Sequence, residues 1–167
     1  KVFREERELT VMLLVDASKS TLYGTGKGLK KEAIAELAAL LAYAAIKNND
    51  KVGLMMFTDQ VEYYIPPKKG KSHVYHVIKE ILTYEPKHQL TSLAAPLQTL
   101  TKVLHRHSIC FLISDFLQDT LHDRSFDQAL GVAAQKHDLI AMQLWDESEF
   151  SLPDLGVIPM CDPESGY

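Results

Sequence analysis

The sequence contains little cysteine and tryptophan: 2 cysteines and 1 tryptophan among 167 residues. Cys110 lies inside an apolar run and Cys161 lies near the end of the chain. Two cysteines placed in this way do not form a disulfide framework, which excludes a small disulfide-stapled secreted domain. A reducing compartment is favoured, and we expect the protein to be cytoplasmic.

The sequence also lacks a basic excess and a long apolar run. Its net charge of -4 argues against nucleic-acid binding, because a phosphate-binding surface usually needs a basic excess. No apolar stretch reaches the roughly 18–20 residues of a membrane helix, and none has the pattern of a signal peptide. The longest candidate, Leu37–Ile46, is rich in alanine and predicts a buried helix.

What is present indicates one folded domain. Hydrophobic residues make up 46% of the chain and charged residues 24%, a balance typical of globular proteins. A length of 167 residues suits a single domain, which we place at residues 1–167. The chain begins at Lys1, without methionine, on the charged stretch KVFREERE, and we expect it to be a domain cut from a longer protein.

Short apolar runs alternate with longer stretches that have helical spacing. The runs show no strict alternation, which predicts strands buried on both faces, as in a parallel sheet. These expected strands are Leu9–Val15, Val52–Phe57, Ile109–Ile113 and Leu139–Leu144. The expected helices are Lys30–Lys47, His73–Thr83, with Leu82 on its apolar face, Ser92–His105 and Phe126–Lys136.

One further strand, Val61–Ile65, follows Val52–Phe57 after a turn too short for a parallel crossover. It therefore predicts an antiparallel hairpin, and Pro66 and Pro67 suit an edge. A last short strand is expected near Gly156–Met160. The order of elements predicts a three-layer α/β sandwich, Rossmann-like, with a mostly parallel central sheet and one antiparallel edge strand.

Each of the four apolar runs is followed within two residues by an aspartate, at Asp16, Asp59, Asp115 and Asp146, and Asp16 and Asp115 are the two that could share a site. In an open α/β sheet, ligands bind beyond the carboxyl ends of the strands, so the two carboxylates would meet there if their strands are neighbours. The alternative is that each aspartate only caps the helix or turn that follows it.

The stretch Asp16-Ala17-Ser18-Lys19-Ser20 has a more specific pattern. Side chains at positions 16, 18 and 20 of a loop can turn toward one point. A carboxylate and two hydroxyls are hard oxygen donors of the kind that Mg²⁺ accepts. Two neutral hydroxyls would leave the ion electron-poor, so that it seeks an anionic oxygen from outside. An Asx or Ser turn is the equally open alternative.

The stretch DASKS resembles the D-x-S-x-S motif of von Willebrand factor A domains, which forms a metal-ion-dependent adhesion site. That site also uses a threonine and an aspartate from later loops, and Thr91 in QLTSL and Asp115 in ISDF stand at suitable places. The resemblance implies that Ser18 and Ser20 bind Mg²⁺ or Mn²⁺ directly. It implies that Thr91 binds directly or through water, and that Asp16 and Asp115 act mostly through water.

Longer stretches resemble the MoxR-associated family of domain of unknown function 58 over nearly the whole chain. They are EERELTVMLLVDASKS, NNDKVGLMMFTDQVEYYIPPKKG, ISDF, LPDLG and DPESG. Because the motif supplies metal ligands but no acid–base pair, we expect a binding module and not an enzyme. The resemblance implies that it works with a MoxR-type AAA+ ATPase in protein assembly or maturation. A partner protein would donate an Asp or Glu to the ion, and the isolated domain would hold the ion weakly.

Other functions have weaker support in the sequence. A Mg²⁺-dependent phosphoester hydrolase is the main alternative, although a haloacid-dehalogenase-type enzyme would need an aspartate where Ser18 stands. The glycine-rich stretch Gly24–Gly28 lacks the Gly-Lys-Ser/Thr ending of a nucleotide-binding loop. A serine nucleophile would need a general base, and the sequence has no G-x-S-x-G elbow. A zinc site would have to use histidines that lack cysteine or acidic partners at metal spacing: His73, His76, His105 and His107.

Overall fold

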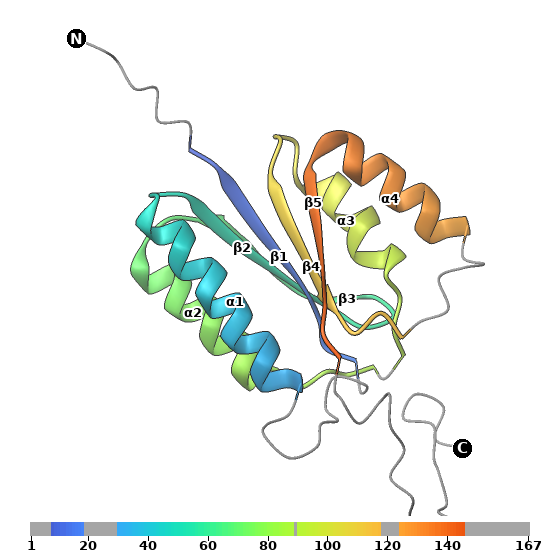
Figure 1. The fold of residues 1–167 in the computed structure, drawn as a ribbon, viewed down its shortest axis with the longest axis horizontal. Coiled ribbons are helices and arrows are strands. Elements are labelled where there is room, and N and C mark those ends of the chain that lie inside the picture. The colour runs from blue at the N-terminus through green and yellow to red at the C-terminus, as the bar shows by residue number, and fades with distance from the viewer. Residues whose placement is uncertain (1–7, 19–29, 89, 118–123, 146–167) are drawn as a thin grey trace, which may run out of the picture.

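The computed structural model describes residues 8–18, 30–88, 90–117 and 124–145. In these residues a five-stranded sheet has the strand order β3-β2-β1-β4-β5, with helices on both sides (Figure 1). No helix of this described part is both long and apolar enough to cross a membrane. The elements are β1 (Thr10–Asp16), α1 (Lys30–Lys47), β2 (Lys51–Phe57), β3 (Val61–Lys68), α2 (Lys71–Thr83), α3 (Ala94–Val103), β4 (Ile109–Ser114), α4 (Arg124–Lys136) and β5 (Asp138–Gln143).

The central strand β1 pairs in parallel with β2 on one side and with β4 on the other. Val15 lies opposite Met56 in β2 and opposite Ile113 in β4. β5 continues the parallel sheet beyond β4, whereas β3 pairs antiparallel with β2 at the other edge. The predicted three-layer sandwich, the antiparallel edge hairpin and the adjacency of β1 and β4 are therefore confirmed.

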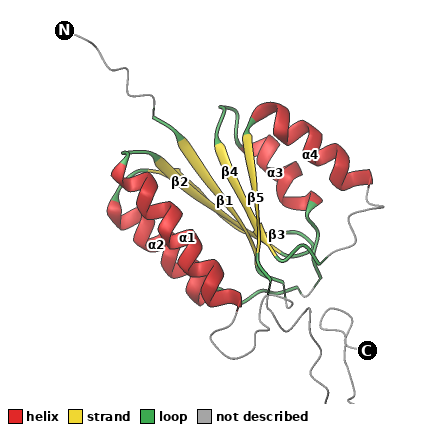
Figure 2. Cartoon of the chain, viewed as in Figure 1, coloured by secondary structure: helices red, strands yellow, loops and turns green. Residues whose placement is uncertain are grey.

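Each face of the sheet is covered by a pair of helices: α1 and α2 lie on one side, and α3 and α4 lie on the other (Figure 2). Alternate residues of β1 enter different cores. Leu13 and Val15 belong to the cluster under α1 and α2, whereas Met12 and Leu14 belong to the cluster under α3 and α4. Because both faces are covered, the strand carries an unbroken apolar run.

Two expectations from the sequence were wrong. The strand predicted at Leu139–Leu144 was expected to be buried on both faces, but β5 is mostly exposed, with Ile140 at 42%. The physical reason is its position, since β5 lies at the edge of the described sheet. Leu82, expected on the buried face of α2, is also exposed, because it lies at an open groove between α1 and α2 and not beneath the two helices. The expected strand near Gly156–Met160 and the loop Gly24–Gly28 lie outside the described residues.

Candidate functional site

The carboxyl ends of β1 and β4 bring together the two aspartates that the sequence indicated. Val15 and Ile113 lie side by side in the sheet, so the residues that follow them leave at the same edge. Asp16 and Asp115 are both almost fully buried, at 1% and 2% exposure, and Ser18 is fully buried beside them. The structure therefore places three of the five predicted site residues in one polar cluster. Ser20 lies outside the described residues.

The Asp16 carboxylate accepts hydrogen bonds on both oxygens. Its Oδ1 accepts from the backbone N–H of Ser18 at 2.8 Å, and its Oδ2 accepts from the Ser114 hydroxyl at 2.6 Å. The first bond forms an Asx turn, the alternative structure for this stretch. Burial raises the pKa of Asp16, hydrogen bonds from Ser114 and Ser18 oppose this, and the nearby Asp115 adds to the rise.

The Asp115 carboxylate has a cationic partner that the sequence did not indicate. Lys30 Nζ, on the first residue of α1, lies 3.4 Å from Asp115 Oδ2, and Lys30 is itself buried. Asp115 Oδ1 accepts a hydrogen bond from the backbone N–H of Leu117 at 3.3 Å. Phe116, between them, has a left-handed φ of 56°, and its N–H donates to Ser114 Oγ at 3.0 Å. These contacts fix the turn that follows β4.

Thr91, the fourth predicted residue, lies in the loop before α3 and is half-buried. The neighbouring Ser92 N–H donates to the carbonyl of Thr58 at 2.8 Å. Thr58 follows Phe57, the last residue of β2, whose carbonyl accepts from Ala17 N–H at 2.9 Å. Backbone hydrogen bonds thus attach the Thr91 loop and the DASKS loop to the same end of β2.

A second polar centre, around Glu62 of β3, was not predicted. The Glu62 carboxylate accepts hydrogen bonds from Thr58 Oγ1, Tyr84 OH, Lys87 N–H and His88 N–H. Partial burial alone would raise the pKa of Glu62, but these bonds outweigh it and lower the pKa to about 2. A Glu one residue into an edge strand gives little sequence signal, because three of its four donors lie more than twenty residues away and two of those are backbone groups.

The donor chemistry of the cluster fits a hard divalent cation. Carboxylate and hydroxyl oxygens are the ligands that Mg²⁺ and Mn²⁺ prefer. Among the described residues no group of three or more His, Cys, Asp or Glu side chains could hold a metal. Both oxygens of Asp16 already accept hydrogen bonds, which suits an indirect contact through water.

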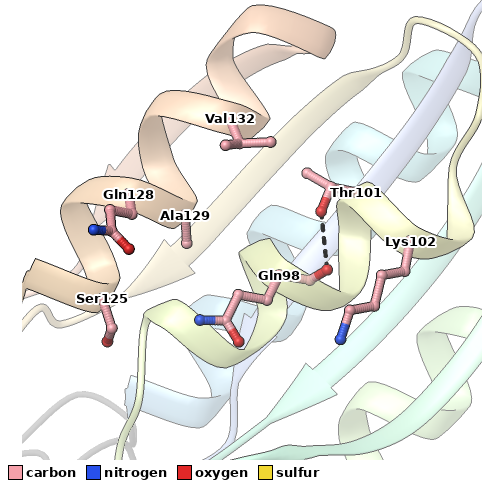
Figure 3. Close-up of a pocket in the computed structure, with 7 residues that line it drawn as sticks. All are labelled: Gln98, Thr101, Lys102, Ser125, Gln128, Ala129 and Val132. Atoms are coloured by element: carbon pink, nitrogen blue, oxygen red, sulfur yellow. Dashed lines mark hydrogen bonds between the residues drawn. The ribbon is translucent and has the colours of Figure 1, made fainter.

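An open groove of about 280 Å³ lies elsewhere, between α3 and α4 (Figure 3). Gln98, Thr101 and Lys102 come from α3, and Ser125 and Gln128 come from α4. The Thr101 hydroxyl is bonded to the carbonyl of Gln98 at 2.9 Å. The lining contains no carboxylate and no histidine, so it offers no general base for the Ser125 hydroxyl.

Comparison with known proteins places the chain in a family. The family model described as protein of unknown function DUF58 matches residues 1–167. Uncharacterized proteins of Mycobacterium bovis and Mycobacterium tuberculosis are each 26% identical over 163 residues. The match covers 96% of this chain and 50% of each relative, so the chain spans about half the length of these relatives.

Solved structures share the fold at low sequence identity. The conserved hypothetical protein BatB from Bacteroides thetaiotaomicron has a TM-score of 0.65 and 18% identity, covering 81% of this chain and 66% of BatB. An aerotolerance-related membrane protein from Bacteroides fragilis, solved with multiple mutations to serine, has a TM-score of 0.67 and 17% identity, covering 81% and 67%. These similarities concern the arrangement of the sheet and helices alone.

Proposed function

The chain belongs to the DUF58 family, and we propose that its domain is a metal-ion-dependent protein-binding module with an adhesion-type ion site. One observation carries the proposal. Two buried carboxylates, Asp16 and Asp115, and the buried Ser18 converge beyond the carboxyl ends of neighbouring parallel strands. That position is where open α/β sheets bind their ligands.

The residues that would hold the ion divide into two groups. Ser18, Ser20 and Thr91 would offer hydroxyl oxygens directly, as in the von Willebrand factor A domains that the sequence resembles. Asp16 and Asp115 would act mainly through water, which agrees with the hydrogen bonds already made by Asp16. When bound, Mg²⁺ or Mn²⁺ would supply a Lewis-acidic position with a preference for an anionic oxygen.

The partner is proposed to be a protein that donates an Asp or Glu carboxylate to the ion. A MoxR-type AAA+ ATPase is the candidate implied by the family resemblance, with a role in protein assembly or maturation. The match covers only half of the mycobacterial relatives, so this partnership is a proposal for the domain. A cytoplasmic location, expected from the cysteine content, also stays a prediction.

Binding is favoured over catalysis by the groups around the site. The hydrogen-bond donors around Asp16 and Asp115 in the described residues include hydroxyls, backbone N–H groups, an amide and the Lys30 ammonium. Both carboxylates are engaged as acceptors, and none of these described neighbours is a histidine that could serve as general base. We therefore propose that the site binds and does not turn over a substrate.

The test begins with the metal alone. Isothermal titration of Mn²⁺ and Mg²⁺ into the domain should give one weak site, and Ser18→Ala should weaken it. Ser72→Ala, at an exposed serine in α2, is the matched control and should leave it unchanged. Absence of any saturable Mn²⁺ binding to the wild-type domain would overturn the ion site.

Two further measurements separate binding from chemistry. A purified MoxR-type AAA+ ATPase from the same genome should bind the domain in Mg²⁺, and EDTA should abolish the complex. Mg²⁺-dependent hydrolysis of p-nitrophenyl phosphate that is lost in Asp16→Asn would instead favour the phosphoester hydrolase.

A further inference from the structure

We propose that Glu62 is a positioning residue for the candidate ion site: its carboxylate holds the loop between α2 and α3 against the end of β2 and so places Thr91. This inference rests on the proposed function, because it needs an ion site to which Thr91 contributes. It adds a residue that lies on the antiparallel hairpin, outside the five positions of the ion-site motif.

The Glu62 carboxylate joins two parts of the chain through a symmetrical set of bonds. Oε1 accepts from the Thr58 hydroxyl at 2.6 Å and from His88 N–H at 3.0 Å. Oε2 accepts from the Tyr84 hydroxyl at 2.7 Å and from Lys87 N–H at 2.8 Å. Three of the four donors belong to the loop after α2, and the fourth belongs to the residue that follows β2. Charge-assisted bonds of this kind are the stronger ones in proteins.

Thr58 links this clamp to the candidate ion site. Its hydroxyl donates to Glu62, while its carbonyl accepts from Ser92 N–H at 2.8 Å. Thr58 is fully buried, and it follows Phe57, whose carbonyl accepts from Ala17 N–H. Ala17 lies between Asp16 and Ser18. The Thr91 segment and the DASKS loop are therefore both held by backbone hydrogen bonds to neighbouring residues, Thr58 and Phe57. Glu62 binds the part of the loop that precedes Thr91.

The turn of the hairpin adds contacts to the same loop. Gln60 Nε2 lies 2.6 Å from His88 Nε2, and His88 Nδ1 lies 3.7 Å from Asp59 Oδ1. At the other end of the loop segment, Lys31 Nζ donates to the carbonyl of Tyr84 at 2.8 Å. These contacts are exposed or partly buried and lie around the Glu62 clamp. At the clamp itself, backbone N–H groups of the loop donate directly to a side chain of β3.

The chemistry of the clamp requires a carboxylate. All four groups around Glu62 are donors, and an ionised carboxylate accepts on both oxygens. A glutamine has one oxygen, so its NH₂ would face one hydroxyl, which can accept, and one backbone N–H, which cannot. Glu62→Gln should therefore lose the bond to one loop N–H and the charge that strengthens the others, while keeping the shape of the side chain.

The experiment compares Mn²⁺ affinity by isothermal titration at pH 7 in three variants. Glu62→Gln should weaken Mn²⁺ binding about tenfold, the scale on which supporting residues affect metal sites. Glu85→Gln, an exposed carboxylate in the same loop, controls for the change of charge and should have no effect. Val77→Ala, fully buried in α2, controls for a general loss of stability: it should lower the melting temperature while Mn²⁺ affinity stays within about twofold.

A double-mutant cycle separates positioning from a merely structural role. If Glu62 acts through Thr91, Glu62→Gln should add little to the loss of Mn²⁺ affinity already caused by Thr91→Ala. Additive losses would overturn the proposed route. If Glu62→Gln does not fold, Tyr84→Phe removes a single donor to the clamp and should weaken Mn²⁺ binding by a smaller factor.

The outcomes distinguish the two proposals. A wild-type domain that does not bind Mn²⁺ overturns the proposed function, and the positioning role falls with it. A wild-type domain that binds Mn²⁺, together with Glu62→Gln and Tyr84→Phe variants that bind it equally well, overturns the positioning role alone.

Discussion

Lys30 Nζ lies 3.4 Å from Asp115 Oδ2, and the two side chains are 6% and 2% exposed. The contact joins the first residue of α1 to the residue that follows β4, 85 positions later. A buried carboxylate without a partner would be costly, and the ammonium offsets that charge. The candidate ion site therefore contains a cation of its own, which a divalent ion would have to accommodate.

Lys30→Met should increase the affinity for Mn²⁺ about tenfold. The change keeps most of the length of the side chain but removes an ammonium that repels a divalent ion, an effect on the order of 1 kcal/mol or more near buried groups. Calorimetric titration measures it, with Lys47→Met, at the exposed far end of α1, as the control. A weaker affinity in Lys30→Met would show that the lysine supports the ion site and does not compete with the ion.

Asp16→Asn should raise the melting temperature of the metal-free domain by about 2–4 °C and should also weaken Mn²⁺ binding. Burial raises the pKa of Asp16, so ionising this side chain at neutral pH works against folding. Asparagine can still accept from Ser18 N–H and can donate to Ser114 Oγ, which preserves both contacts. Differential scanning calorimetry in EDTA tests the prediction, and a lower melting temperature would contradict it.

The Glu62 clamp should make stability depend on acid pH. The pKa of Glu62 falls from its ordinary value of 4.5 to about 2 in the folded protein. Its stabilisation is therefore complete above pH 4.5 and is lost as the pH falls toward 2. At pH 7, wild type should exceed Glu62→Gln by about 1–2 kcal/mol in free energy of unfolding, a value kept modest by the partial exposure of Glu62.

Urea unfolding between pH 7 and pH 2 measures this difference. The gap between wild type and Glu62→Gln should close as the pH falls, whereas Glu85→Gln should follow wild type throughout. A gap that stays constant across this range would show that the lost stability does not come from the ionised carboxylate.

A glycine-to-alanine change should lower the free energy of unfolding at one position and raise it at another. A Cβ at Gly53 in β2 would lie 2.9 Å from Met12 Cε and 3.0 Å from the carbonyl oxygen of Ile65. Gly53→Ala should therefore lower the free energy of unfolding by about 1–3 kcal/mol. Gly131 lies in α4 with open space around the same point, so Gly131→Ala should raise it by about 0.5–1 kcal/mol. Chemical denaturation of both variants checks the two signs.

Much of the fold could be predicted because its signals are local. The apolar run that became β1 is unbroken, since both of its faces meet helices. The hairpin followed from the few residues between Phe57 and Val61, which allow no crossover. The exposure of β5 could not be predicted from local signals. Its apolar residues resemble those of β4, and only the strand order shows that it lies at an edge.

The sequence by itself determined that strands and helices alternate and that an aspartate follows the runs that form β1 and β4, because these signals are local. The strand order makes β1 and β4 neighbours and so brings Asp16 and Asp115 together, and it belongs to the tertiary structure. The tertiary structure decided which groups those carboxylates contact. Ser114 reaches Asp16 across 98 positions, and Lys30 reaches Asp115 across 85. Glu62 holds the loop after α2 because the tertiary structure places that loop against the hairpin. Polar contacts of this kind depend on the distance and direction of single side chains after packing, and no spacing along the chain encodes them.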